Sequence, residues 1–187
     1  MIRSFLAIEL PKSIVKKIEE VQDELKLSRA DVRWVSPGKI HLTLKFFGNI
    51  DESKIESIVQ AIEGPGKATP SFSLKVKGLG AFPHLKNPRV VWMGLTEGRD
   101  NLTTFQRQLE EELEKIGFER EERPFQPHLT LGRSNSSRRR DELSGMMEKY
   151  REEEFGEFPV EKVVLFKSDL RPSGPIYTAL KEVKLGE

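Results

Sequence analysis

The sequence predicts an α+β fold of two similar lobes, each of mostly antiparallel sheet with helices outside, and a central cleft between two motif strands. Three observations lead to this prediction. The tetrapeptide His-Leu-Thr-Leu stands at residues 41–44 and again at 128–131. Apolar residues alternate in some segments and recur at helical spacing in others. The order strand, helix, motif strand, helix, strand occurs twice, which predicts two related lobes.

These spacings place the elements along the chain. Strands are expected at 2–8, 32–35, 40–47, 71–77, 90–95, from 128 onward, at 160–166 and at 176–183, and helices at 12–27, 51–64, 100–117 and 140–150. Asp51 and Asp100 are expected as N-caps, and Gly64 as the end of its helix. Residues 64–70 then form a turn. We expect one bilobal domain over 1–187, with a pseudo-repeat of about 1–80 and 88–187, a seam near 78–88, and elements able to swap between lobes.

Each motif strand sorts its side chains onto two faces. Successive residues of a strand point to opposite faces, so His41 and Thr43 share one face. His128 and Thr130 share the equivalent face of the second copy. Two such strands opposite each other would line a cleft with two imidazoles and two hydroxyls. Ordinary amphipathic strands are the alternative, but with three histidines in the chain this coincidence has a chance of roughly one in a thousand.

Two imidazoles in one cleft can supply a general base and a general acid, because histidine titrates near neutral pH. Threonine hydroxyls donate well to phosphate oxygens, which suits displacement at phosphorus on a 2′,3′-cyclic phosphate. No metal or other cofactor is expected, since no His-Glu-x-x-His, carboxylate-rich or Cys₄ pattern is present. A zinc site made from the three histidines of the chain, His41, His84 and His128, remains an alternative.

Composition limits the partners and the compartment. The net charge of +1 argues against a nucleic-acid binder that works by bulk charge, but leaves room for a local basic site such as Arg138–Arg140. The absence of cysteine excludes disulfides and thiolate sites and fits the cytoplasm. The apolar N-terminus is interrupted by Arg3 and Glu9 and halted by Pro11, so no membrane association is expected.

At these residues the sequence resembles the 2H phosphoesterase superfamily, and more narrowly the RNA 2′,3′-cyclic phosphodiesterases historically called 2′-5′ RNA ligases. The resemblance covers essentially the whole chain. It rests on the two motifs and on the opening strand 2–8, Arg33-Trp34-Val35, Pro88 to Trp92, Pro127 to Arg133, and Leu165 to Ser168 with Gly174 and Tyr177.

The resemblance implies a LigT-like fold and metal-independent hydrolysis of RNA 2′,3′-cyclic phosphate ends to 2′-phosphates. It further implies that His128 is the base that activates water and His41 the acid that protonates the departing 3′ oxygen. Thr43 and Thr130 would bind the phosphate. The residues alone give the pair of histidines, and only the resemblance assigns the roles.

Phe46 and Arg133 each stand five residues after their histidine, where the resemblance implies a base-stacking aromatic and a phosphate-contacting arginine. An odd offset would place both side chains on the core face of a regular strand. Either role therefore requires the strand to end or to bulge near Gly48 or Gly132. For Phe46, a place in the core is the alternative.

Two other functions stay open at this point. One is ATP-independent 2′-5′ ligation of RNA, for example of tRNA halves, because the Lys-x-Asp-Gly signature of adenylate-forming ligases is absent. The other is an RNA-binding module without turnover that uses Arg133 and Arg138–Arg140. The expected partner in each case is RNA, with a cyclic phosphate end in the first, and the expected state is a monomer.

Overall fold

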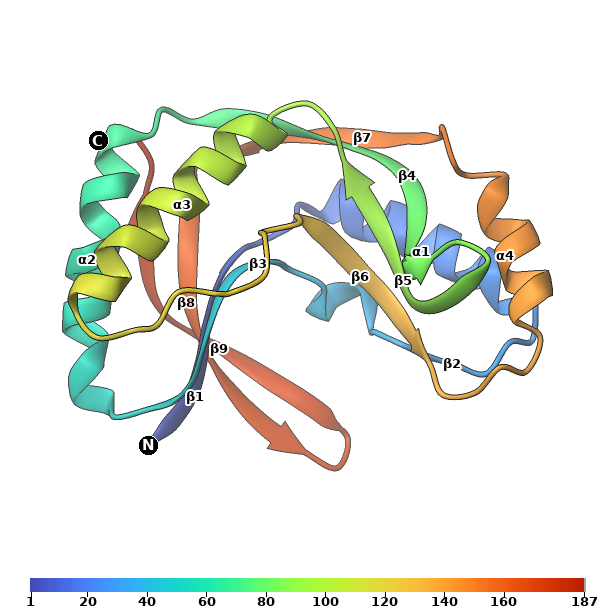
Figure 1. Ribbon diagram of the computed structural model, residues 1–187, viewed down its shortest axis with the longest axis horizontal. Helices are drawn as coiled ribbons and strands as arrows, with labels where there is room; N and C mark the ends of the chain where they lie inside the picture. The colour runs from blue at the N-terminus through green and yellow to red at the C-terminus, as the bar shows by residue number, and fades with distance from the viewer. Residues whose placement is uncertain (187) are drawn as a thin grey trace.

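The computed structural model describes residues 1–186 and contains two sheets in which all neighbouring strands are antiparallel (Figure 1). The first sheet has the order β3 (Leu42–Ile50), β1 (Ile2–Ile8), β8 (Lys162–Arg171) and β9 (Gly174–Lys184). The second has the order β2 (Val32–Trp34), β6 (His128–Ser134), β5 (Asn87–Leu95), β4 (Phe72–His84) and β7 (Glu154–Val160). The two motif strands are therefore β3 and β6, one in each sheet, and both run through the middle of Figure 1.

Two helices belong to each sheet. α2 (Ile55–Ala68) contacts β9 and also α3 (Arg99–Lys115), whereas α1 (Lys12–Lys26) contacts β7 and α4 (Arg140–Glu148) contacts β4 and β5. The helices bury apolar stripes such as Ile14, Ile18, Val21 and Leu25 of α1, and these join the inward faces of both sheets in one continuous core. The α+β prediction with helices outside the sheets is confirmed.

Each sheet draws on both halves of the chain. β1 and β3 pair in the first sheet with β8 and β9 from the end of the chain. β2 and β4 from the first half pair in the second sheet with β5, β6 and β7. The helix α1 likewise lies on the sheet that holds the second motif. Each motif strand is thus embedded in a sheet built from both halves of the chain.

The expected end of the second helix at Gly64 was wrong. α2 continues through Gly64, Pro65 and Gly66 to Ala68, so the segment 64–70 is mainly helix and not a turn. A methyl group on Gly66 would lie 3.2 Å from the Lys184 carbonyl oxygen and from Val183. Gly66 is therefore a residue of close helix-to-strand packing, a role that its sequence neighbours do not reveal.

The second half also differs from expectation in its strands. The expected seam at 78–88 is a hairpin of β4 and β5 within one sheet. β7 was not predicted; its pairing with β4 makes it an edge strand, and its apolar residues Phe155 and Phe158 are buried. α3 is preceded by Gly98 at a φ of 79°, so Asp100 lies inside the first turn and is not the cap.

None of the helices in residues 1–186 has both the length and the apolar character needed to span a bilayer.

Candidate active site

The first motif lies on the outer face of the first sheet, beside a small group of aromatic rings. His41 immediately precedes β3, and its ring centroid is 4.9 Å from that of Phe166, 5.2 Å from Tyr177 and 5.9 Å from Phe5. Phe5 and Phe166 belong to a four-residue apolar cluster that is separate from the main core. Thr43 pairs with Ala7, a member of the same cluster, and therefore shares this face.

A bulge in β3 changes the face that its later residues occupy. Thr43 pairs with Ala7 and Lys45 with Leu6, so Leu44 is an extra residue in the ladder. Lys45 consequently turns into the core, and Phe46 turns outward, where it is 59% exposed and its ring lies 5.8 Å from Phe5. Phe46 thus joins the face of His41 and Thr43 despite its odd offset.

The second motif lies on the corresponding face of the second sheet. His128 begins β6, with its ring 5.0 Å from Phe82 and 6.3 Å from Trp92. Its Nδ1–H donates to the carbonyl oxygen of Gln126 at 2.6 Å, which leaves Nε2 as the nitrogen able to accept a proton. Thr130 pairs with Trp92, so its side chain lies on the same face as the indole.

The second motif strand bulges at the equivalent position. Gly132 pairs with Val91 and Thr130 with Trp92, which makes Leu131 the extra residue. Arg133 is thereby exposed on the face of His128 and Thr130. The irregularity that the odd offsets required is present in both strands, immediately after the threonine, and a separate shift after Phe46 adjoins Gly48.

Each bulge is supported from behind by a buried glutamine of a helix. Gln22 of α1 donates from Nε2 to the carbonyl oxygens of Leu131 at 3.0 Å and Val35 at 2.7 Å. Gln106 of α3 donates from Nε2 to the carbonyl oxygen of Leu44 at 3.4 Å. These glutamines are only 1% and 6% exposed. Since a bulge interrupts the ladder, a side-chain donor at its carbonyl keeps a buried acceptor satisfied.

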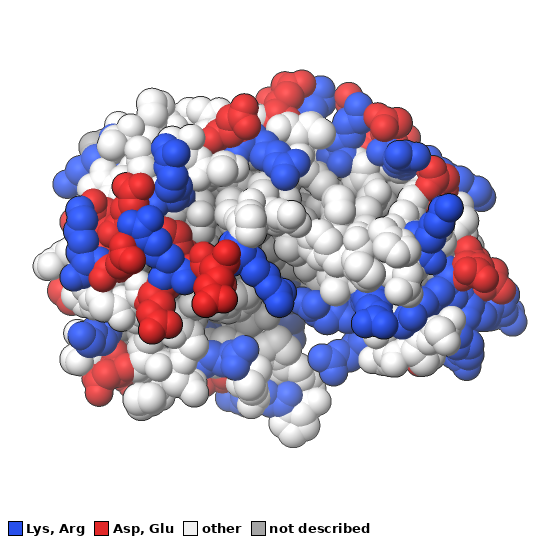
Figure 2. All heavy atoms as spheres, in the orientation of Figure 1, with Lys and Arg blue, Asp and Glu red and all other residues white. Residues whose placement is uncertain are grey.

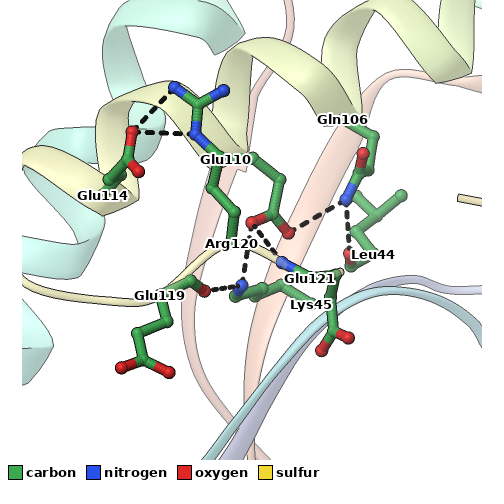
Figure 3. Close-up of polar contacts among 8 residues, drawn as sticks. All are labelled: Leu44, Lys45, Gln106, Glu110, Glu114, Glu119, Arg120 and Glu121. Carbon is green, nitrogen blue, oxygen red and sulfur yellow. Dashed lines mark hydrogen bonds and ion pairs between the residues drawn. The ribbon is translucent and has the colours of Figure 1, made fainter. Parts of the chain in front are cut away.

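A buried ion pair adds to this support beneath the first motif (Figure 3). Lys45 Nζ lies 2.8 Å from Glu110 Oε2 and also donates to the Glu119 carbonyl oxygen at 2.7 Å. Glu110 in turn accepts from Gln106 at 3.1 Å and from the Glu121 backbone N–H at 3.4 Å. The network joins β3 and α3 to the segment that leads into the second motif strand. The matching position in the second copy is Gly132, which packs against Val32 and Trp34 instead.

The electrostatic settings of the two imidazoles differ. Burial lowers the pKa of both from its ordinary value. The pKa of His41 is partly restored by the negative charge of Glu9 and by the backbone carbonyl of Lys39. For His128 the carbonyl of Gln126 opposes burial, whereas the positive charge of Arg133 lowers the pKa further. Proton binding is therefore favoured by a neighbouring charge at His41 and opposed by one at His128.

The structure gathers the expected residues into two clusters, His41, Thr43 and Phe46 on the first sheet and His128, Thr130 and Arg133 on the second. His84 is in neither, because it ends β4 opposite Asn87, seven residues along β5 from Gly94, the partner of His128. That separation is about 23 Å at the rise of a strand, too far for a shared zinc ion. Within residues 1–186, no three His, Cys, Asp or Glu side chains are grouped as a metal site would need.

Several aromatic residues of these clusters were not predicted to be site residues from the sequence. Phe5, Phe166 and Tyr177 surround His41, and Phe82 and Trp92 adjoin His128. Strand alternation could have placed Phe5 and Trp92 on an outer face, but the pairing of strands distant in sequence is needed to bring them to a particular histidine.

A family model described as the 2′-5′ RNA ligase superfamily matches residues 10–172. The chain belongs to this superfamily. A relative from Methanothermobacter thermautotrophicus, named RNA 2′,3′-cyclic phosphodiesterase, is 37% identical over 98% of this chain and 99% of its own length. A relative of the same name from Aquifex aeolicus is 36% identical over 100% of this chain and 98% of its own length.

Solved structures support the same membership. The protein TT0787 of Thermus thermophilus has a TM-score of 0.80 and 27% identity, covering 98% of each chain. LigT of E. coli in complex with 3′-AMP has a TM-score of 0.78 and 25% identity, covering 100% of this chain and 99% of that one. The expected LigT-like fold is confirmed.

Proposed function

We propose that the protein is a hydrolase that opens RNA 2′,3′-cyclic phosphate ends to 2′-phosphates. One observation carries this proposal: the two His-x-Thr strands have the same bulge and present the same set of polar groups on their outer faces. The names of relatives that match nearly the whole chain support the choice of substrate. The net charge of +1 and the local arginines fit an enzyme with one anionic site better than a general nucleic-acid binder.

In the proposed mechanism His128 is the general base. Its Nδ1–H is held by Gln126, so the unprotonated Nε2 can take a proton from the attacking water. Arg133 favours this neutral form before the reaction begins. His41 is the general acid, because Glu9 favours its protonated form. As water oxygen bonds to phosphorus, the bond from phosphorus to the 3′ oxygen breaks, His41 protonates that oxygen, and the phosphate stays on the 2′ oxygen.

The remaining polar groups bind the phosphate in this proposal. Thr43 and Thr130 donate hydroxyl hydrogens to non-bridging oxygens, and Arg133 offsets the negative charge. Phe46, exposed and next to Phe5, provides a surface on which the terminal base stacks. Neither a metal ion nor an organic cofactor has a part in the mechanism.

The test uses a short RNA with a labelled 2′,3′-cyclic phosphate, in EDTA, with wild type, His41→Ala and His128→Ala. We expect a 2′-phosphate from wild type and losses of ~10² or more in both variants. A requirement for divalent metal, or a 3′-phosphate product, would contradict the proposal. Circular dichroism of the variants shows whether a loss of activity comes from unfolding.

The superfamily description favours a second candidate, ATP-independent 2′-5′ ligation, in which a ribose 5′-hydroxyl replaces water. Incubation with tRNA halves and no ATP would give a joined product that resists a nuclease specific for 3′-5′ links. RNA binding without turnover is the remaining alternative, and it requires that RNA affinity survive replacement of both histidines while no product forms.

We further propose that the enzyme acts as a monomer in the cytoplasm. Five large apolar side chains are exposed within residues 1–186, and only two of them, Leu170 and Ile176, belong to the same hairpin; the others are Met1, Leu27 and Phe46. They do not form the extended apolar face of a stable dimer. Sedimentation analysis and cell fractionation test the two parts of this proposal separately.

A further inference from the structure

Two arginines face each other beside the second motif. Arg33 of β2 is paired in register with Arg133 of β6, so both side chains lie on the same face. Both are exposed, and the ion pairs that arginines form within residues 1–186 involve other positions. Like charges directly opposite each other destabilise a sheet. An anion bound between them would turn that repulsion into an attraction.

Arg133 of this pair lies on β6, the strand that carries the second motif, and Arg33 lies beside it on β2. Val90 pairs with Arg133 and Trp92 with Thr130, and both are on the outer face of β5. From His128 to Arg133 the strand extends about 15 Å, the length of a few nucleotides of single-stranded RNA. A chain of phosphates that leaves the two histidines along β6 would therefore reach the arginine pair.

Positive charge continues beyond the end of β6. The loop after it is tied to the start of β2, because the Asp31 N–H donates to the Arg138 carbonyl and the Asn135 N–H to the Asp31 carbonyl. Arg138 is exposed, with Asp31 as an acidic neighbour that Asn135 already engages. A groove follows in which Lys86 is an exposed cation. Its other lining residues are Asn87, Ser137, Arg139, Arg140, Asp141 and Glu142, and Arg139 is ion-paired with Glu142.

Figure 2 shows these charges as a band. Lys and Arg side chains gather along the lower right of this face, over β2, β6 and the start of α4, with few acidic side chains among them. On the left, over α3, acidic and basic side chains are mixed. A chain with a net charge of only +1 thus has a basic strip on this face, and the strip begins beside a catalytic candidate.

We propose that a basic strip of Arg33, Arg133, Arg138 and Lys86 binds the phosphodiester backbone of single-stranded RNA on the 5′ side of the cyclic phosphate. The proposal rests on the hydrolase function proposed above and extends it from the terminal nucleotide to the body of the substrate. Guanidinium groups suit phosphates because they present several donors in one plane. Affinity from such contacts does not depend on base sequence and falls as salt rises.

The test compares two substrates, a 2′,3′-cyclic mononucleotide and an octanucleotide that ends in the same cyclic phosphate. The variant Arg33→Gln/Lys86→Gln/Arg138→Gln removes three charges of the strip and leaves Arg133 in place. The matched control Lys16→Gln/Lys54→Gln/Arg99→Gln removes three exposed charges from α1, the start of α2 and α3. Thermal melts establish that both proteins are folded.

We expect the strip variant to lose at least about tenfold more kcat/KM on the octanucleotide than on the mononucleotide. The salt dependence of kcat/KM for the octanucleotide should become shallower by about two in its log–log slope, since each single-strand phosphate contact contributes ~0.7. The control should leave the ratio between the two substrates unchanged. The proposal would be overturned if the strip variant lost kcat/KM equally on both substrates, or if the control changed the ratio between the substrates by the same factor.

Failure of the hydrolase proposal can be told apart from failure of the strip. If wild type turns over neither substrate, the hydrolase function fails, and fluorescence anisotropy with an octanucleotide that ends in a 3′-phosphate then tests the strip alone. Weaker binding by the strip variant but not by the control would support it. Equal affinities of all three proteins would overturn it.

Discussion

His41 lies against three aromatic rings on the first sheet, with Glu9 as its nearby charge, whereas His128 lies beside Phe82, Trp92 and Arg133 on the second. The backbone plan of the two strands is the same, down to the bulge after the threonine. A duplicated scaffold thus provides matched geometry, and the neighbours outside the motif distinguish one imidazole from the other. One histidine can be protonated while the other is neutral only if their surroundings differ, because two histidines in equal surroundings would titrate alike.

The largest effect is expected from a test of the acid and base assignment. His41→Ala and His128→Ala should each lose ~10² to 10⁴ on a 2′,3′-cyclic phosphate. A nucleoside 2′-phosphate esterified with p-nitrophenol has a leaving group that departs without a proton. On this ester His41→Ala should regain most of its activity and His128→Ala should not, as followed by release of nitrophenolate. Rescue of His128→Ala alone would reverse the assignment.

The next effect concerns the buried ion pair beneath the first motif, which has no counterpart at the second motif within residues 1–186. Lys45→Met should cost about 3–5 kcal/mol in the free energy of unfolding, because it leaves Glu110 buried without its partner. Urea unfolding measures this cost. The double variant Lys45→Met/Glu110→Leu should recover a large part of the loss, since it removes the uncompensated charge. A double variant less stable than either single one would contradict this account.

The matching position of the second motif should respond to added volume rather than to lost charge. A methyl group on Gly132 would lie 2.7 Å from Val32 Cγ1 and 2.9 Å from the Trp34 ring. Gly132→Ala should therefore cost about 1–3 kcal/mol by overpacking. Urea unfolding gives the cost, and Gly145→Ala, in an open position of α4, is the control, expected to be neutral or stabilising.

A smaller effect is expected from the glutamines behind the bulges. Gln22→Met and Gln106→Met remove the donors to Leu131 and Leu44, and a buried carbonyl without a partner costs about 1–3 kcal/mol. Gln22→Met should cost more, because Gln22 serves two carbonyls at shorter distances. In NMR spectra Gln22→Met should shift mainly the His128 imidazole signals and Gln106→Met mainly those of His41. The opposite pattern would disprove the support of each bulge by its own helix.

The sequence was sufficient for most of the fold and for placing each motif's histidine and threonine on one face of a strand, because strand alternation and helical periodicity are local. It was insufficient where distant elements decide the local structure. Leu44 and Leu131 look like ordinary strand residues, and only the ladder with β1 or β5 reveals the bulge. Gly66 reads as part of a turn, and only the packing of β9 against it shows why the helix continues through it. Gln22 reads as an exposed polar helix residue, although it is buried beneath the second motif strand and donates to Leu131 there.

The finest test of the comparison is the titration of the two histidines. Glu9 raises the pKa of His41, so Glu9→Gln should lower that pKa and leave His128 unaffected. Arg133 lowers the pKa of His128, so Arg133→Gln should raise that pKa and leave His41 unaffected. Imidazole NMR titrations, assigned with the two alanine variants, measure both. Because His128 must be neutral to act as a base, Arg133→Gln should also confine activity to higher pH, whereas Glu9→Gln should remove activity at the alkaline end by depleting protonated His41. If neither variant changes the pKa of its histidine, these two charges do not distinguish the imidazoles.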